Sequence, residues 1–174
     1  MKILIVTTRL PFPPYKGDRL RIFNIAKYLA RKNEVKIIAI IRSKKEASYI
    51  DNLRKHNIDI VPILLPIWRS IVNLIFGLFS KKPFQVLWFF SPRMKKKVAE
   101  IINKDKPDVV LYYLIRGAQY FVGNGNHLNI VDLIDAISLY LERFEKSEKN
   151  PLRKFLIREE FKRVSGVRKN IGEI

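Results

Sequence analysis

The sequence has no cysteine and only two histidines, which excludes disulfide bonds and leaves few ligands for a metal ion. His56 and His127 stand far apart in the chain, and we expect a structural role for each. No metal site is therefore predicted. The apolar run at the amino terminus, residues 2–6, is shorter than the core of a signal peptide. Its shortness predicts a cytoplasmic protein.

Acidic residues are also scarce. The chain has 16 Asp and Glu against 34 Lys and Arg, so its formal net charge is +18 and its pI about 10.2. This charge favours anionic partners such as nucleic acid, lipid headgroups or phosphorylated ligands. The aromatic residues lie within apolar runs, and no helix-turn-helix or RNA-binding motif is present. These two features argue against nucleic acid as the partner.

Continuous aliphatic runs alternate with segments of helical periodicity along the first two thirds of the chain. The predicted strands span residues 2–8, 34–41, 58–65, 109–113 and 128–133, and the first helices span 18–32 and 44–56. This alternation predicts an α/β fold with a Rossmann-like parallel sheet and flanking helices, although no G-x-G-x-x-G motif is present. We assign 1–140 to this domain and 141–174 to a helical connector that is truncated before a second domain.

The loop after the first strand contains three prolines and ends at Gly17, directly before the first helix. Asp18 is predicted to cap that helix. Gly17 would let a ligand approach the backbone, and the N–H groups of the first turn favour a phosphate. Nearby basic residues add positive charge that also favours a phosphate; they are Arg9, Lys16, Arg19 and Arg21. The alternative interpretation is that Gly17 only completes a turn.

In a parallel sheet of this type, the loops after Tyr113 and Leu133 meet the first loop at the carboxyl ends of the strands. Two residues of the last loop are candidates for a site. Asp135 and Ser138 could cap the following helix, or they could bind sugar hydroxyls and accept a proton. Both interpretations stay open at this stage.

Residues 66–79 are broadly apolar, with a narrow polar stripe formed by Arg69, Ser70, Asn73 and Gly77. The segment is too short to span a bilayer, but a helix with Trp68 and the flanking Lys81 and Lys82 could lie in the headgroup layer. The alternative is a helix packed against its own sheet or against a missing domain. Residues 83–90 are predicted to form a short aromatic strand.

Ser91 and Pro92 are predicted to open the next helix, as a cap and a first-turn proline. Its first turns are basic, with Arg93 and residues 95–97. Positive charge at a helix N-terminus opposes the helix dipole, so these residues do not stabilise the helix. They either serve an anionic partner or form a solvated surface. Residues 136–166 are predicted to form one or two helices broken near Asn150.

Several motifs together resemble a known family. The opening strand is followed by Leu10-Pro11-Phe12-Pro13-Pro14 and by Lys16-Gly17-Asp18-Arg19; later come Ser91-Pro92-Arg93-Met94 and a Val-Asp-x-x-Asp-x-x-Ser pattern over 131–138. These stretches resemble the N-terminal domain of GT-B glycosyltransferases of family four, in particular bacterial sugar transferases associated with exopolysaccharide and exosortase systems. The resemblance covers most of the chain.

The resemblance implies retaining transfer of a sugar from a nucleotide-sugar to a lipid-linked or polysaccharide acceptor, with no other cofactor. By it, Gly17, Lys16, Asp18 and Arg19 would face the donor diphosphate, Arg9, Arg116 and Ser138 would lie on the acceptor side, and Asp135 would be catalytic. The membrane that carries the acceptor would meet Trp68, Arg69, Phe76, Phe79, Lys81 and Lys82.

The family's C-terminal domain binds the donor and carries paired glutamates, and the sequence does not contain that domain. We therefore expect an acceptor-binding half, inactive alone, located in the cytoplasm or on the inner face of the cell membrane. It would be a truncated enzyme, a fragment, or a chain that pairs with a separate donor-binding chain. The alternative function is a non-catalytic basic α/β module that binds anionic membrane or nucleic acid.

Overall fold

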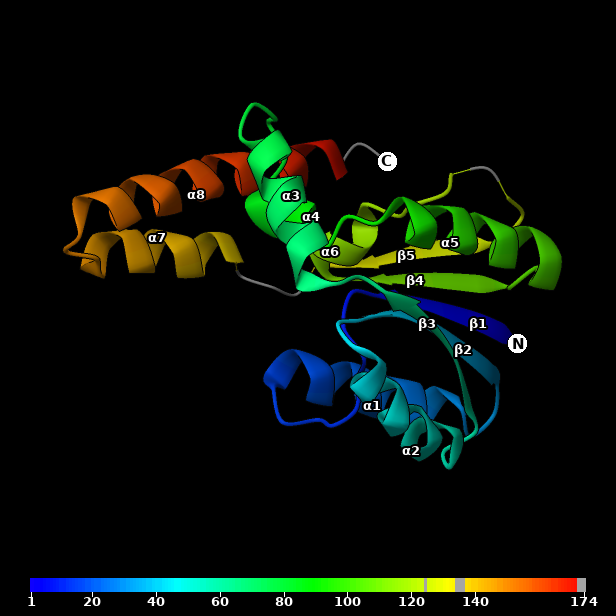
Figure 1. Ribbon diagram of the computed structural model, residues 1–174. Coiled ribbons are helices and arrows are strands. Elements are labelled where there is room, and N and C mark those ends of the chain that lie inside the picture. Colours follow the sequence, from blue (N-terminus) through cyan, green and yellow to red (C-terminus); the bar gives the residue numbers. More distant parts are fainter. Residues whose placement is uncertain (124, 134–136, 172–174) are drawn as a thin grey trace.

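The computed structural model describes residues 1–123, 125–133 and 137–171. Its centre is a five-stranded, all-parallel sheet in the order β3-β2-β1-β4-β5 (Figure 1). The strands are β1 (Lys2–Thr7), β2 (Glu34–Ile41), β3 (Ile58–Leu64), β4 (Val109–Tyr113) and β5 (Leu128–Asp132). Each lies within one residue of its predicted bounds, and the predicted Rossmann-like α/β fold is confirmed.

Helices cover both faces of the sheet (Figure 1). They are α1 (Gly17–Leu29), the 3-10 helix η1 (Lys44–Tyr49), α2 (Ile50–Arg54), α3 (Ile67–Gly77), α4 (Phe84–Trp88), α5 (Pro92–Asp105), α6 (Leu114–Ala118), α7 (Ile137–Ser147) and α8 (Pro151–Ile171). Helices α1 and α2 lie on one face and α5 on the other. The helical break predicted near Asn150 falls between α7 and α8.

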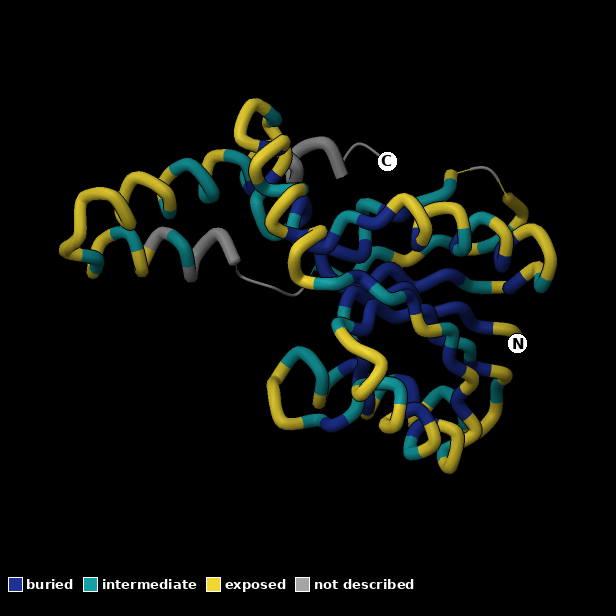
Figure 2. Tube along the Cα trace, in the orientation of Figure 1, coloured by how far each residue is buried: buried dark blue, intermediate teal, exposed yellow. Residues whose placement is uncertain are grey.

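Strand β1 shows why the sheet is buried on both faces. Successive side chains of a strand point to opposite faces, so Ile3 and Ile5 pack in the cluster beneath α1, while Leu4 and Val6 pack in the cluster beneath α5. All four are buried (Figure 2). The continuous apolar run that predicted this strand is therefore a consequence of its two covered faces.

Helix α5 begins as the sequence predicts. The Ser91 side-chain oxygen accepts a hydrogen bond from the backbone N–H of Met94 at 3.3 Å, and Pro92 occupies the first turn. At the other end, Lys106 adopts a left-handed conformation with φ 45° and ends the helix. The motif that starts this helix is local, which is why its start can be predicted from the sequence.

The strand predicted over 83–90 is wrong, because residues 84–88 form the short helix α4. The cause is a contact from far along the chain. The Glu160 carboxylate of α8 accepts hydrogen bonds from the backbone N–H groups of Phe84 and Gln85, which are unpaired donors of the first helical turn. Burial raises the pKa of Glu160, although these two donors act in the opposite direction. The aromatic pattern gives no sign of this cap.

Gly117 of α6 lies against the backbone of β1. A Cβ atom at this position would come within 2.9 Å of the Val6 carbonyl oxygen. We expect Gly117→Ala to lower the free energy of unfolding by about 1–3 kcal/mol, because α6 would have to move off the sheet. Gly166→Ala in α8 is the matched control, since a Cβ there meets no atom within 4 Å. Urea unfolding that showed equal stability for both variants would contradict this packing.

Candidate functional site at the carboxyl edge of the sheet

The strand order places a topological switch point between β1 and β4. The chain moves outward from β1 to β2 and β3, and then returns to the other side of β1 with β4. Ligands of open parallel sheets bind outside the carboxyl ends of the strands at such a point. Directly after β4, the buried Leu114 has φ 63°, a backbone conformation that is rare for leucine and costs energy. The strain lies where the fold predicts a site.

Asp18 joins two of the predicted site residues at this edge. Its carboxylate oxygen lies 3.1 Å from the Arg9 guanidinium and 3.2 Å from that of Arg116. Burial alone would raise the pKa of Asp18, but the charges of the two arginines outweigh burial and hold the pKa below its usual value. The donor-side residue Asp18 and the acceptor-side residues Arg9 and Arg116 therefore form one cluster.

The predicted capping role of Asp18 is wrong. Helix α1 begins at Gly17 after an extended Lys16, and no side chain caps it. Asp18 instead lies in the first turn, where its second oxygen accepts a hydrogen bond from the backbone N–H of Arg19 at 3.0 Å. Its partner Arg9 follows β1, and Arg116 lies on α6, which directly follows β4. The residues around the helix start therefore gave no sign of the Arg116 contact.

Arg42 is a further member of this edge that the sequence prediction missed. It follows β2 directly, and its guanidinium lies 4.9 Å from the centre of the Phe89 ring. The guanidinium groups of Arg9 and Arg116 lie 5.5 Å and 5.1 Å from the same ring. Phe89 is buried, so three cations contact one aromatic side chain in a partly desolvated place. We call Arg9, Arg42 and Arg116 the arginine cluster.

Among the described residues, the side-chain hydrogen bonds of Arg42 involve only one of its two terminal nitrogens. Its Nη1 donates to the Leu65 carbonyl at 3.1 Å and to the Ser70 hydroxyl at 2.6 Å. Its Nη2 is buried and has no hydrogen-bond partner within the described part of the chain. Burial lowers the pKa of Arg42, Glu46 opposes this shift, and Arg9 adds to it. A buried donor in a cationic cluster is satisfied best by an anionic oxygen.

Two more contacts tie α1 to the strands at this edge. Arg21 forms an ion pair with Asp132 at the end of β5, at 3.2 Å. The Tyr113 hydroxyl donates to the backbone carbonyl of Asp18 at 2.9 Å. The first turn of α1 is thereby fixed in front of β4 and β5. These contacts have a signal in the sequence, because Tyr113 and Asp132 lie at the carboxyl ends of two predicted strands.

The other predicted donor-side residues are accessible. Lys16 and Gly17 are exposed, and a Cβ at Gly17 would meet no atom of the chain within 4 Å. Packing within the described residues therefore gives no reason for glycine at this position. Arg19 is half-buried in the same turn. The predicted Asp135 lies outside the described residues, as does the side chain of Ser138 in α7, so their roles stay predictions.

Helix α3 presents its two faces in the opposite way from an ordinary surface helix. Three of the four residues of the polar stripe point inward: Ser70 is buried against Arg42, Asn73 donates to the carbonyls of Leu87 and Phe90 at 3.2 and 2.8 Å, and Gly77 is buried beside Leu87. The fourth, Arg69, is exposed. Most of the large apolar residues of α3 and of the turn after it are exposed (Figure 2). The exposed ones are Ile67, Trp68, Ile71, Val72, Ile75, Phe76, Leu78 and Phe79.

We call these eight exposed residues the apolar face of α3. Phe76 and Phe79 are 80% and 98% exposed. All six residues predicted to contact a membrane lie on α3 or on the turn that follows it, and basic side chains flank the apolar ones. Arg69 lies with its guanidinium 5.2 Å from the Trp68 ring, and Lys81 and Lys82 follow the helix. An apolar side buried on the protein's own sheet, one of the two alternative predictions, does not fit this orientation. The other, packing against a missing domain, stays a prediction.

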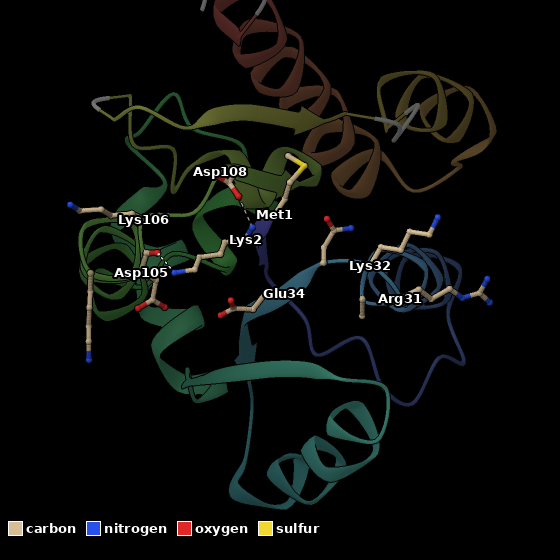
Figure 3. Close-up of a pocket in the computed structure, with 11 residues that line it drawn as sticks. Met1, Lys2, Arg31, Lys32, Glu34, Asp105, Lys106 and Asp108 are labelled. Carbon is tan, nitrogen blue, oxygen red and sulfur yellow. Dashed lines mark hydrogen bonds between the residues drawn. The ribbon is translucent and has the colours of Figure 1, made fainter.

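A surface pocket of about 1010 Å³ opens at the opposite, amino edge of the sheet (Figure 3). Residues that line it are bonded to one another. The Lys2 backbone N–H donates to the Asp108 carboxylate at 2.6 Å, and the Lys2 ammonium donates to the Asp105 backbone carbonyl at 3.4 Å. Glu34, at the start of β2, also lines it. Because ligands of this fold bind at the carboxyl edge, we place the candidate site at the arginine cluster and not here.

None of the helices that the structure describes has both the length and the hydropathy needed to cross a bilayer. The described residues contain no group of three or more His, Cys, Asp or Glu placed to hold a metal ion.

The fold and the site define the chain as a Rossmann-like α/β protein with a cationic carboxyl edge. No known protein-family model matches it, and neither a curated protein nor a solved structure is significantly similar to it. Its function must therefore be argued from the arrangement of its own residues.

Proposed function

We propose that the chain is the acceptor-binding half of a retaining glycosyltransferase that works on the surface of an anionic membrane. A single observation carries the proposal: Arg42 of the arginine cluster donates a hydrogen bond to Ser70 on the inward stripe of α3. This bond places the cationic edge beside the root of the helix whose apolar face is exposed. A lipid-linked acceptor has the matching parts, an anionic phosphate attached to an apolar chain.

The resemblance of the opening motifs supplies the reaction. The acceptor phosphate would contact the arginine cluster, and its lipid would lie along α3. Lys16, Gly17 and Arg19 would face the diphosphate of a nucleotide-sugar held by a further domain or by a separate chain. The acceptor hydroxyl would attack the anomeric carbon of the sugar as the bond from that carbon to the diphosphate oxygen breaks. The nucleoside diphosphate would leave and take up the hydroxyl proton.

Acceptor binding tests this proposal. We would place a polyprenyl-phosphate-linked sugar at low mole fraction in neutral phosphatidylcholine vesicles and measure binding by flotation. The wild-type chain should bind saturably, and Arg9→Gln should weaken binding about tenfold, as expected for loss of one charge-assisted hydrogen bond. Arg31→Gln is the matched control, because Arg31 stacks on Tyr28 at the amino edge. Equal binding by both variants would contradict the acceptor site.

A second function is favoured by the same helix and by the net charge of +18: a basic module that binds anionic membrane without sugar chemistry. It predicts binding to anionic vesicles with no gain from the linked sugar. Binding of a labelled oligonucleotide, with strong salt dependence and no vesicle binding, would instead favour nucleic acid.

A further inference from the structure

A second pocket, of about 910 Å³, lies between helix α8 and the turn that joins α3 to α4. The turn contributes Leu78, Phe79, Ser80, Lys81 and Lys82, and α8 contributes Glu159, Lys162, Arg163 and Gly166. We call it the tip pocket. Its turn follows the C-terminal end of α3, whereas the arginine cluster contacts α3 at Ser70, near the start of the helix. No predicted role accounts for its α8 wall.

The tip pocket is built by specific contacts between the two segments. The Arg163 guanidinium donates to the backbone carbonyls of Leu78 at 3.3 Å and Lys82 at 3.2 Å. The same guanidinium lies 4.3 Å from the centre of the Phe84 ring. One turn earlier on α8, Glu160 caps α4. These bonds hold the turn and the start of α4 against α8.

The charge of the lining is strongly positive. Four basic residues and one acidic residue line the pocket, which gives the lining a net charge of +3. The basic residues are Lys81, Lys82, Lys162 and Arg163, and the acidic residue is Glu159. The carboxylate pairs with Lys162 at 2.8 Å. Lys81, by contrast, is exposed on the turn. An anionic group is the natural ligand of such a lining.

The rim of the pocket is apolar, and this property separates a lipid from a free anion. Leu78 and Phe79, the last residues of the apolar face, are more than half exposed beside the lysines. A soluble phosphate ester gains nothing from these side chains. A phospholipid at a bilayer surface contacts both, because its phosphate lies next to its acyl chains.

We infer that the tip pocket binds the phosphate headgroup of an anionic phospholipid, with Leu78 and Phe79 inserted beside its acyl chains. The inference rests on the membrane contact proposed above and adds a defined headgroup site to it. Together with the apolar face, the site would fix the chain at two ends of α3 and so orient the arginine cluster toward the bilayer. Helix α8 takes a direct part in membrane binding through Lys162 and Arg163.

The test compares two double variants of equal charge. Lys81→Ala with Lys162→Ala removes two lysines of the pocket, and Lys27→Ala with Lys55→Ala removes two exposed lysines from α1 and the end of α2. Flotation uses vesicles of phosphatidylcholine with phosphatidylglycerol at roughly 30%. We expect the pocket variant to bind about tenfold more weakly than the control variant. Equal affinities would overturn the headgroup site.

Two further arms separate the possible failures. If the wild-type chain does not bind these vesicles, the membrane contact and the headgroup site both fail. The acceptor assay in neutral vesicles is read separately, so loss of acceptor binding alone leaves the headgroup site standing. Inorganic phosphate is added as a soluble competitor; release of the wild-type chain from vesicles at millimolar phosphate and constant ionic strength would show a free-anion site and overturn the lipid assignment.

Discussion

Replacing Phe76 and Phe79 with serine is expected to abolish binding to anionic vesicles while leaving the free energy of unfolding unchanged. Both side chains are almost fully exposed, so their removal takes nothing from the core. Insertion of a phenylalanine side chain into an apolar phase contributes about 1.5–3 kcal/mol. The double variant should therefore lose at least roughly a hundredfold in vesicle affinity.

Tyr28→Ser provides the control for this prediction. Tyr28 is also an exposed aromatic residue, but it lies on α1, on the other side of the sheet. Its replacement should leave flotation with anionic vesicles unchanged. A comparable loss of binding in the control, or wild-type binding by the double variant, would show that another surface meets the membrane. Urea unfolding of each variant confirms that the fold is intact.

Asp18→Ala is expected to have the largest effect on stability. The substitution removes the carboxylate on which the guanidinium groups of Arg9 and Arg116 converge, and Arg116 is only 9% exposed. Loss of an acceptor for a buried cation costs roughly 2–3 kcal/mol. Asp51→Ala removes a carboxylate whose partner Arg54 lies on the open surface. That control should change the free energy of unfolding by less than about 0.5 kcal/mol.

The same carboxylate gives the stability a pH dependence. Because the pKa of Asp18 in the folded state lies below its usual value, the ionised form stabilises the fold above the unfolded-state pKa of about 4. This contribution is lost as the pH falls through the folded-state pKa. Asp18→Asn should therefore lower the stability at neutral pH and flatten its decrease in acid. Urea midpoints that fall in parallel for the wild type and the variant would contradict the assignment.

The sheet could be predicted because its determinants are local or periodic. The continuous aliphatic runs mark strands covered on both faces, and Ser91 with Pro92 marks the start of α5 within four residues of sequence. The approximate bounds of five strands and the start of α5 follow from these patterns. They require no knowledge of which strands are neighbours.

The errors arose where a distant side chain decides the local structure. Glu160 gives α4 its N-terminal acceptor from 76 residues away, so an aromatic segment becomes helix. Asp18, predicted as a cap, instead lies in the first turn and pairs with Arg116, 98 residues along the chain. Arg42 had a usable signal, since it directly follows a buried strand and so had to lie at the carboxyl edge. The polar stripe of α3 was recognised, but only the packed structure shows that Ser70, Asn73 and Gly77 face inward while Arg69 stays exposed.

Contact between the apolar face of α3 and a membrane can be measured directly, because Trp68 belongs to that face. Trp88, the only other tryptophan, is half-buried and can be replaced by phenylalanine, which keeps a ring beside Arg42. We would record the emission of Trp68 in this variant with vesicles of phosphatidylcholine and phosphatidylglycerol, with and without brominated acyl chains. We expect a blue shift of the emission on binding and quenching by the brominated lipid. Binding to the vesicles with an unshifted, unquenched Trp68 would contradict this contact.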